Sequence, residues 1–219
     1  MKVSKEGAYV SLKTNQGSAD ELRNFLIASA PVVKETEPDT LLWIALQLEE
    51  NTFAIFDTYT NIEGKNAHFQ GKVAGELAEK APTLIAGGWN NGVLKNVIHP
   101  KILGAKVDTK HTNKVKKALV IKFTSSKGKQ EEVVDFLINS ANIVEETESE
   151  TLFWYGLRID DNTFATIVLF SDQYGIDLHM SGQVARKLQE KAPDWIEGDW
   201  EKGIIEHINI FDVIAIISQ

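Results

Sequence analysis

The chain has 219 residues, of which 43% are hydrophobic and 25% charged, a composition typical of a globular protein and not of a disordered one. No apolar run approaches the ~18 residues of a membrane span, and MKVSKEGAYV at the start lacks the apolar stretch of a secretory signal, so we expect a cytoplasmic protein with no membrane partner. The net charge is −8, there is no cysteine, and basic residues concentrate only at residues 107–117, which argues against disulfides, thiolate metal sites and a nucleic-acid partner.

The first half begins with a strand, a helix and a hairpin. Apolar residues at positions 9, 10 and 12, answered in the second half by the apolar run at residues 119–123, predict the strand. SADE at residues 18–21 is a capping-box pattern, and the apolar positions that follow it share one helical face. Residues 40–48 and 52–59 are rich in β-branched and aromatic side chains and are joined by the short polar turn EEN, which predicts two antiparallel neighbouring strands.

A second helix and a last strand complete the half. Residues 64–80 predict a helix that Gly71 divides into a short and a longer segment, with Pro82 helping to stop it. The apolar stretch at residues 93–102 predicts the last strand. The resulting order, β-α-β-β-α-β, is that of the ferredoxin-like unit, an antiparallel four-stranded sheet with both helices on one face.

The sequence then repeats itself. AHFQGKVAGELAEKAP at residues 67–82 recurs as LHMSGQVARKLQEKAP at residues 178–193, and the same offset holds without a gap through most of the half. Two copies with so long a period indicate a duplicated domain and not a solenoid. We predict a first domain at residues 1–106, a linker at 107–117 and a second domain at 118–219. Because each sheet has an apolar face that its helices leave open, we expect the two halves to form an intramolecular pseudo-dimer; further self-association stays open.

The segments at residues 40–77 and 151–188 also carry a family resemblance. TLLWIALQLEENTFAIFDTYTNIEGKNAHFQGKVAGEL is similar to the antibiotic-biosynthesis monooxygenase (ABM) family, through a hairpin, a polar turn and a helix that opens with A-H-F. The second copy, with LHM in that place, fits less closely. The resemblance implies an α+β fold in which two tandem ferredoxin-like repeats close into a single-chain barrel of the dimeric type. It also implies, as one activity of the family, oxidation of aromatic compounds or quinols by O₂ without metal, flavin or other cofactor.

Four residues are the candidate catalytic groups: His68, Tyr59, Asp57 and Asn66. Histidine is the side chain that exchanges a proton near neutral pH, and a phenolic substrate needs polar groups in an otherwise aromatic cavity. The structural alternative is that His68 packs at the Gly71 break and that the others end a strand or lie at the surface. ABM helices often carry a second histidine five residues after the first, where this chain has Val73 and Val184.

Four further residues are candidate ligand-binding groups: Trp43, Trp154, Tyr155 and His179. The aromatic rings could stack on a flat ligand, and His179 repeats His68 in the second half. The alternative for the aromatic residues is the hydrophobic core.

The two halves differ at polar positions of the candidate site. Asp57 and Tyr59 correspond to Val168 and Phe170, whereas the glycine at 71 is kept at 182. We therefore expect the first half to retain more of the polar pocket.

No sequence motif indicates a bound metal or cofactor. His99, His111 and His207 lack metal-ligand spacing, and no phosphate-binding or dinucleotide-binding glycine motif occurs. The haem-degrading members of the family use an Asn, a Trp and a His that are not matched here, which disfavours haem degradation. Two hypotheses remain: a cofactor-independent monooxygenase acting on a small aromatic or quinol-like compound, or a non-catalytic barrel that binds a small apolar ligand or serves a structural, stress-related role.

Overall fold

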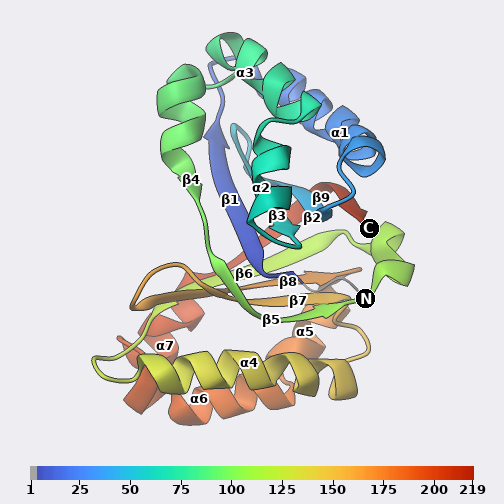
Figure 1. Cartoon of the computed structure of the whole chain (residues 1–219). Helices are drawn as coiled ribbons and strands as arrows, with labels where there is room; N and C mark the ends of the chain where they lie inside the picture. Colours follow the sequence, from blue (N-terminus) through green and yellow to red (C-terminus); the bar gives the residue numbers. More distant parts are fainter. Residues whose placement is uncertain (1–3) are drawn as a thin grey trace. The chain divides into compact units, whose positions relative to one another are not determined.

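A computed structural model of the chain describes residues 4–219. The protein is α+β and divides into two compact units, whose elements are labelled in Figure 1. The first unit comprises the described residues up to Pro100 together with Asp212–Gln219, and the second comprises Lys101–Phe211. No helix among residues 4–219 is both long enough and apolar enough to cross a membrane.

The first unit has the predicted β-α-β-β-α-β order. Its elements are β1 (Glu6–Lys13), α1 (Ala19–Thr36), β2 (Thr40–Glu49), β3 (Thr52–Tyr59), α2 (Ile62–Phe69), α3 (Lys72–Leu84) and β4 (Val97–Ile98). β1 lies between β3 and β4, β3 pairs with β2, and all these pairings are antiparallel. The hairpin of β2 and β3 and the division of the second helix at Gly71 are as the sequence predicts.

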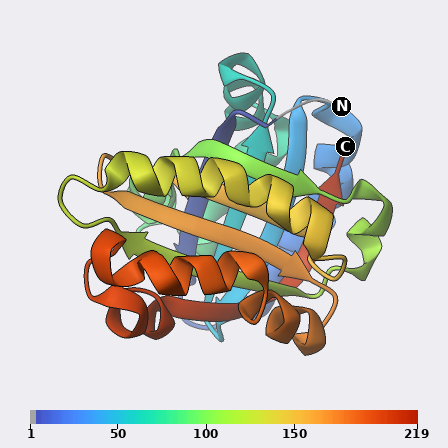
Figure 2. The ribbon, with the colours of Figure 1, turned by 90° about the horizontal axis from the view of Figure 1, so that it is seen from below.

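The second unit repeats these elements. They are β5 (Lys101–Val107), a 3-10 helix (Thr109–Lys114), β6 (Lys117–Thr124), α4 (Gln130–Thr147), β7 (Phe153–Arg158), β8 (Thr163–Phe170), α5 (Gln173–Met180), α6 (Gln183–Trp195), α7 (Asp199–Gly203), a second 3-10 helix (Ile205–His207) and β9 (Ile208–Ser218). β8 pairs antiparallel with both β6 and β7, and β7 pairs with β5. Figure 2 shows α4 and α6 side by side over one face of this sheet.

The last strand of each sequence repeat belongs to the other compact unit. β5 ends the first repeat but pairs with β7, from Lys101↔Arg158 to Val107↔Phe153. The C-terminal part of β9 ends the second repeat but pairs with β2, from Leu42↔Ser218 to Gln47↔Asp212. The compact units therefore do not follow the boundaries of the duplicated sequence, since each sheet is completed by a strand from the other copy.

A hydrophobic core fills the space between helices and sheet in each unit. Trp43 lies in the first core with side chains of α1 and α3, and Trp154 lies in the second with side chains of α4 and α6. Both indoles are at most 1% exposed. Because side chains alternate along a strand, every second residue of β3 and β8 points toward the helices, and Asp57 and Tyr59 are in phase with the core residue Phe53.

Three local predictions are wrong. Ser18 does begin α1, but its hydroxyl donates to the Thr83 carbonyl, 3.2 Å away, and makes no capping bond. The expected strand at residues 93–102 is partly helical, because Gly87 and Gly88 adopt positive φ and open a helical turn over Gly88–Val93, so that the long strand starts only at Lys101. Pro82 lies inside α3, which continues to Leu84.

Candidate functional site

A short helix positions each of the two equivalent histidines. The Asn61 side chain accepts a bond from the Gly64 amide and starts α2, and Asp172 does the same for α5 through Gly175. Both helices are eight residues long, and the histidine lies in the last turn, just before the glycine break. His68 is 8% exposed and His179 is 6% exposed, so both rings are buried.

In the first unit, His68 binds a carboxylate that the sequence analysis did not identify. His68 Nδ1 lies 2.5 Å from Glu37 Oε2. Glu37 is the C-cap residue directly after α1, and its Oε2 also accepts a bond from the Thr40 hydroxyl at 3.1 Å. The pair joins the end of α1, the start of β2 and the end of α2 in one buried hydrogen-bond network.

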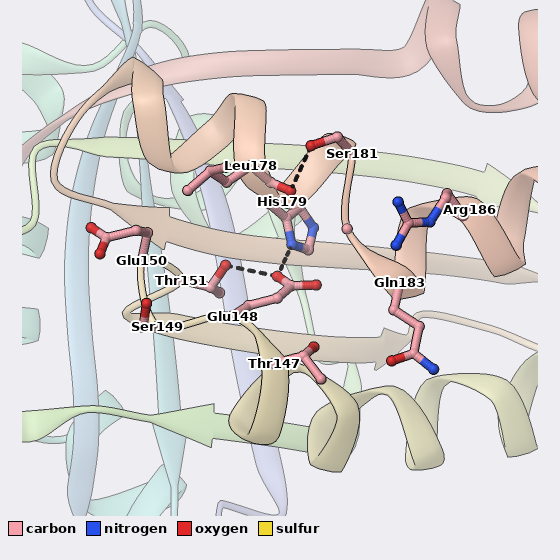
Figure 3. A pocket seen from close by; sticks show the side chains of 11 residues that line it. Thr147, Glu148, Ser149, Glu150, Thr151, Leu178, His179, Ser181, Gln183 and Arg186 are labelled. Carbon is pink, nitrogen blue, oxygen red and sulfur yellow. Dashed lines mark hydrogen bonds and ion pairs between the residues drawn. The ribbon is translucent and has the colours of Figure 1, made fainter.

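The second unit contains the same arrangement. His179 Nδ1 lies 2.6 Å from Glu148 Oε2, and the Thr151 hydroxyl donates to that oxygen at 2.9 Å (Figure 3). Glu148 is the C-cap residue of α4, as Glu37 is of α1. The pairing of histidine and glutamate is therefore a property of the duplicated unit.

A glycine makes room for each glutamate. A Cβ placed on Gly71 would lie 2.6 Å from Glu37 Oε1, and one on Gly182 would lie 2.7 Å from Glu148 Oε1. Both distances are far below van der Waals contact. The break that the sequence shows at these glycines thus has a steric function, because it lets the N-terminus of α3 or α6 approach the buried carboxylate.

The first unit adds a second carboxylate and a phenol. Asp57 Oδ2 lies 3.4 Å from His68 Nε2 and accepts a bond from the Tyr59 hydroxyl at 3.1 Å. Asp57 is 3% exposed and Tyr59 is fully buried. Among the described residues, three buried side-chain oxygens have no hydrogen-bond partner: Asp57 Oδ1, Glu37 Oε1 and, in the second unit, Glu148 Oε1. The imidazole of His68 is held between two carboxylates.

This arrangement fixes the charge of His68. Burial opposes the charged ring, but the Asp57 carboxylate and then the Glu37 carboxylate outweigh it and raise the pKa of His68 to about 10. Burial also raises the pKa of Asp57, although the neighbouring His68 acts against this, and burial together with the Asp57 charge raises the pKa of Tyr59 well above its ordinary value. At neutral pH His68 is therefore an imidazolium and does not have a free lone pair.

The second unit lacks this extension. Val168 and Phe170 stand where the first unit has Asp57 and Tyr59. The Phe170 ring lies 5.6 Å from the His179 ring, centroid to centroid, much as Tyr59 lies 5.4 Å from His68. The packing of the histidine is kept, whereas the second carboxylate is replaced by an apolar side chain.

The two sites also differ in the space beside them. A cavity of about 430 Å³ lies at the second pair, and His179, Glu148 and Thr151 line it. The corresponding cavity at His68 and Glu37 measures about 160 Å³. Pockets for small organic ligands usually measure roughly 300–1,000 Å³, so only the second cavity reaches this range.

The remaining predicted site residues lie elsewhere. Asn66 is exposed on α2, away from the buried cluster. Trp43 and Trp154 are core residues and line neither cavity. Tyr155 is 1% exposed and follows Trp154 on β7, so it points to the opposite face of the sheet. Of the candidate catalytic residues, the structure brings together His68, Asp57 and Tyr59 and leaves out Asn66.

A signal for the missed glutamates was present in the sequence. The triplet Glu-Thr-Glu at residues 35–37 is repeated without change at 146–148, just beyond the apolar face of the first helix of each copy. Among residues 4–219, no group of three or more His, Cys, Asp or Glu side chains is arranged to hold a metal ion.

Comparison with known proteins adds the fold family. No protein-family model matches the sequence, and no curated protein matches it. Among solved structures, a provisionally assigned monooxygenase of Fusobacterium nucleatum superposes with a TM-score of 0.79 at 15% identity, covering 100% of this chain and 96% of that one. A ferredoxin-fold protein of Listeria monocytogenes related to antibiotic biosynthesis monooxygenases gives 0.52 at 6% identity, over 97% and 96% of the two chains.

The chain has the fold of these monooxygenase-related proteins. An anthrone oxidase-like protein shows the same ABM-type fold, with a TM-score of 0.60 at 8% identity over 99% of this chain and 94% of the other. These likenesses confirm the resemblance seen in the sequence and the predicted fold class, two tandem ferredoxin-like repeats of the dimeric α+β barrel type. At such low identities the ABM-type fold does not determine a substrate.

Proposed function

We propose that the chain is a cofactor-independent monooxygenase of a small aromatic or quinol-like compound, with its working site in the second unit. The observation that carries the proposal is the buried Glu148–His179 pair at the wall of a 430 Å³ cavity. A histidine held by a carboxylate and open to a ligand-sized cavity is the arrangement of a general base.

Glu148 gives His179 its role. A carboxylate 2.6 Å from Nδ1 holds the ring proton on that nitrogen, which leaves the lone pair on Nε2. Val168 replaces the aspartate that would bind Nε2, so no second carboxylate holds a proton there. His179 is therefore suited to take a proton from a substrate hydroxyl, and Glu148 stabilises the imidazolium that results.

The reaction needs O₂ as its only co-reactant. His179 removes the proton from a phenol, and the phenolate donates electrons to O₂ to form a carbon–oxygen bond and a peroxide. The imidazolium protonates the peroxide. Loss of the ring C–H proton with cleavage of the O–O bond then gives a quinone and water, so that one oxygen atom enters the product and the other leaves as water.

This proposal places the working site in the second unit, whereas the sequence analysis expected the first half to retain more of the polar pocket. His68, with Asp57 and Tyr59, stays a candidate, but its ring is protonated at neutral pH and the cavity beside it is small. We propose that the first-unit cluster is a structural charge pair and that catalysis belongs to the second unit. The monooxygenase and anthrone oxidase-like descriptions of proteins with the same fold support the reaction class.

The test compares the two histidines directly. O₂ uptake is measured with a panel of naphthols, anthrones and quinols for the wild type, His179→Gln and His68→Gln. We expect His179→Gln to lower turnover by about 10²-fold or more, because general-base catalysis contributes on that order, while His68→Gln retains activity in the folded protein. Loss confined to His68→Gln would move the site to the first unit. Saturable binding without O₂ uptake would show the non-catalytic alternative.

A further inference from the structure

We propose that the substrate of the second-unit cavity carries a carboxylate and that Arg186 binds it. This inference rests on the proposed function for the location of the site and adds the chemical class of the substrate. It identifies a specificity residue in addition to the Glu148–His179 pair.

Arg186 is placed to bind an anion in the cavity. It lies in the first turn of α6 and lines the cavity together with Gln183. In Figure 3 the Arg186 side chain extends from α6 toward the side on which His179 lies. Within residues 4–219 the structure shows no ion pair for the Arg186 side chain. On the same helix, by contrast, the Lys191 ammonium lies 2.8 Å from the Glu190 carboxylate. An unpaired guanidinium presents a planar set of N–H donors that matches a carboxylate.

The other charges of the cavity determine which end of the substrate can be anionic. Glu148 is bound to His179, and Glu150 lies on the opposite side of that pair from Arg186 (Figure 3). An anionic group is therefore repelled at the Glu150 end and attracted at the Arg186 end. Leu178 also lines the cavity, and its apolar side chain offers a surface against which an aromatic ring of the substrate can pack.

The first unit offers no guanidinium at this place, and the lysine that lines its smaller cavity, Lys72, lies near a carboxylate. Arg186 corresponds to Gly75, which has open space around it, and Gln183 corresponds to Lys72, whose ammonium lies 3.9 Å from Glu76. The arginine thus occurs in the unit that has the larger cavity and the histidine without a second carboxylate. Together these features describe a site for a compact hydroxylated aromatic acid.

The experiment uses two probes that differ in one group, 1-hydroxy-2-naphthoate and 1-naphthol. Their dissociation constants are measured by titration calorimetry with the full chain, for the wild type, Arg186→Gln, Arg186→Lys and Lys187→Gln. Lys187 is the matched control, because it is exposed on the same helix, loses the same charge and does not line this cavity.

We expect Arg186→Gln to weaken binding of the naphthoate by about tenfold, to leave the naphthol unchanged and to remove most of the salt dependence of naphthoate binding. Arg186→Lys restores part of the affinity, and Lys187→Gln has no effect. Equal affinities of the two probes in the wild type, or equal effects of Arg186→Gln and Lys187→Gln, would overturn the role of Arg186 and leave the proposed site intact. Failure of both probes to bind, with no O₂ uptake in the panel, would overturn the site itself.

Discussion

His68 Nε2 lies 3.4 Å from Asp57 Oδ2, and this contact is what distinguishes the two histidine–glutamate pairs of the protein. With two carboxylates beside it, the first imidazole is a charged structural group. With Val168 in the place of Asp57, the second has a single carboxylate and faces a cavity. The loss of Asp57 in the second copy thus separates a buried ion network from a histidine that has a single carboxylate partner.

The first prediction concerns the pH dependence of stability. The pKa of His68 is about 10 in the folded protein and about 6.5 in an unfolded chain. A raised pKa means that the folded state holds the proton more tightly, so this contribution to stability is fully present below pH 6.5 and is lost as the pH rises through 10. The raised pKa of Asp57 acts in the same direction at lower pH. We expect the melting temperature to fall between pH 7 and 10.

Asp57→Asn isolates this effect. The variant removes the charge that contributes most to raising the pKa of His68, so its melting temperature should depend less on pH over the same interval. Calorimetric scans at half-unit steps give the comparison. Parallel curves for the wild type and Asp57→Asn would show that His68 is not the titrating group.

The second prediction concerns the glycine beside Glu37. Gly71→Ala places a methyl group 2.6 Å from Glu37 Oε1, and the carboxylate or the start of α3 must move. We expect the free energy of unfolding to fall by about 1–3 kcal/mol. Chemical denaturation measures the change.

Gly75→Ala is the control for Gly71→Ala. Gly75 lies inside α3 with no atom within 4 Å of its added Cβ, so alanine should stabilise the helix by about 0.5–1 kcal/mol. The two substitutions are chemically identical and lie four residues apart. Changes of the same sign in both would contradict the steric role assigned to Gly71.

The third prediction concerns the exchanged strand. A chain that ends at Phe211 lacks the segment that pairs with β2 and lacks Ile217, a buried residue of the first core. We expect a loss of about 3 kcal/mol or more and a melting temperature lower by about 6 °C or more. Hydrogen exchange should increase first in β2.

Ile210→Ala provides the comparison for the truncation. Ile210 lies on the same strand but is 43% exposed and belongs to the other compact unit, so its substitution should change stability little. Unchanged protection of β2 in the truncated chain would show that the β9 pairing does not stabilise the first unit.

Most helices and strands could be predicted from the sequence because each depends on a pattern among neighbouring residues. The hairpin follows from two apolar runs and a short polar turn, and the division of the second helix follows from Gly71. The partner of β5 was not readable, because an apolar strand carries no local signal of which sheet edge it joins. The length of the strand was misjudged for a similar reason, since helical turns held by glycines with positive φ precede it.

The candidate site was only partly readable. Histidine at residues 68 and 179 stood out because its chemistry is rare and its position is repeated. Glu37 did not, because a glutamate at the end of an amphipathic helix looks like any solvated charge until the fold buries it. Cavity size depends on how side chains pack, so the sequence could not show that the less polar half has the larger space.

The exchange of strands has a consequence for synthesis on the ribosome. The strand that completes the sheet of the first unit, Asp212–Ser218, is translated only after the whole of the second unit. While the second half is still being made, β2 has an unpaired edge and the nascent chain lacks Ile217 in its core. The N-terminal half therefore cannot finish folding ahead of the C-terminal half, and a chaperone that shields strand edges should bind the nascent protein until the strand that pairs with β2 emerges.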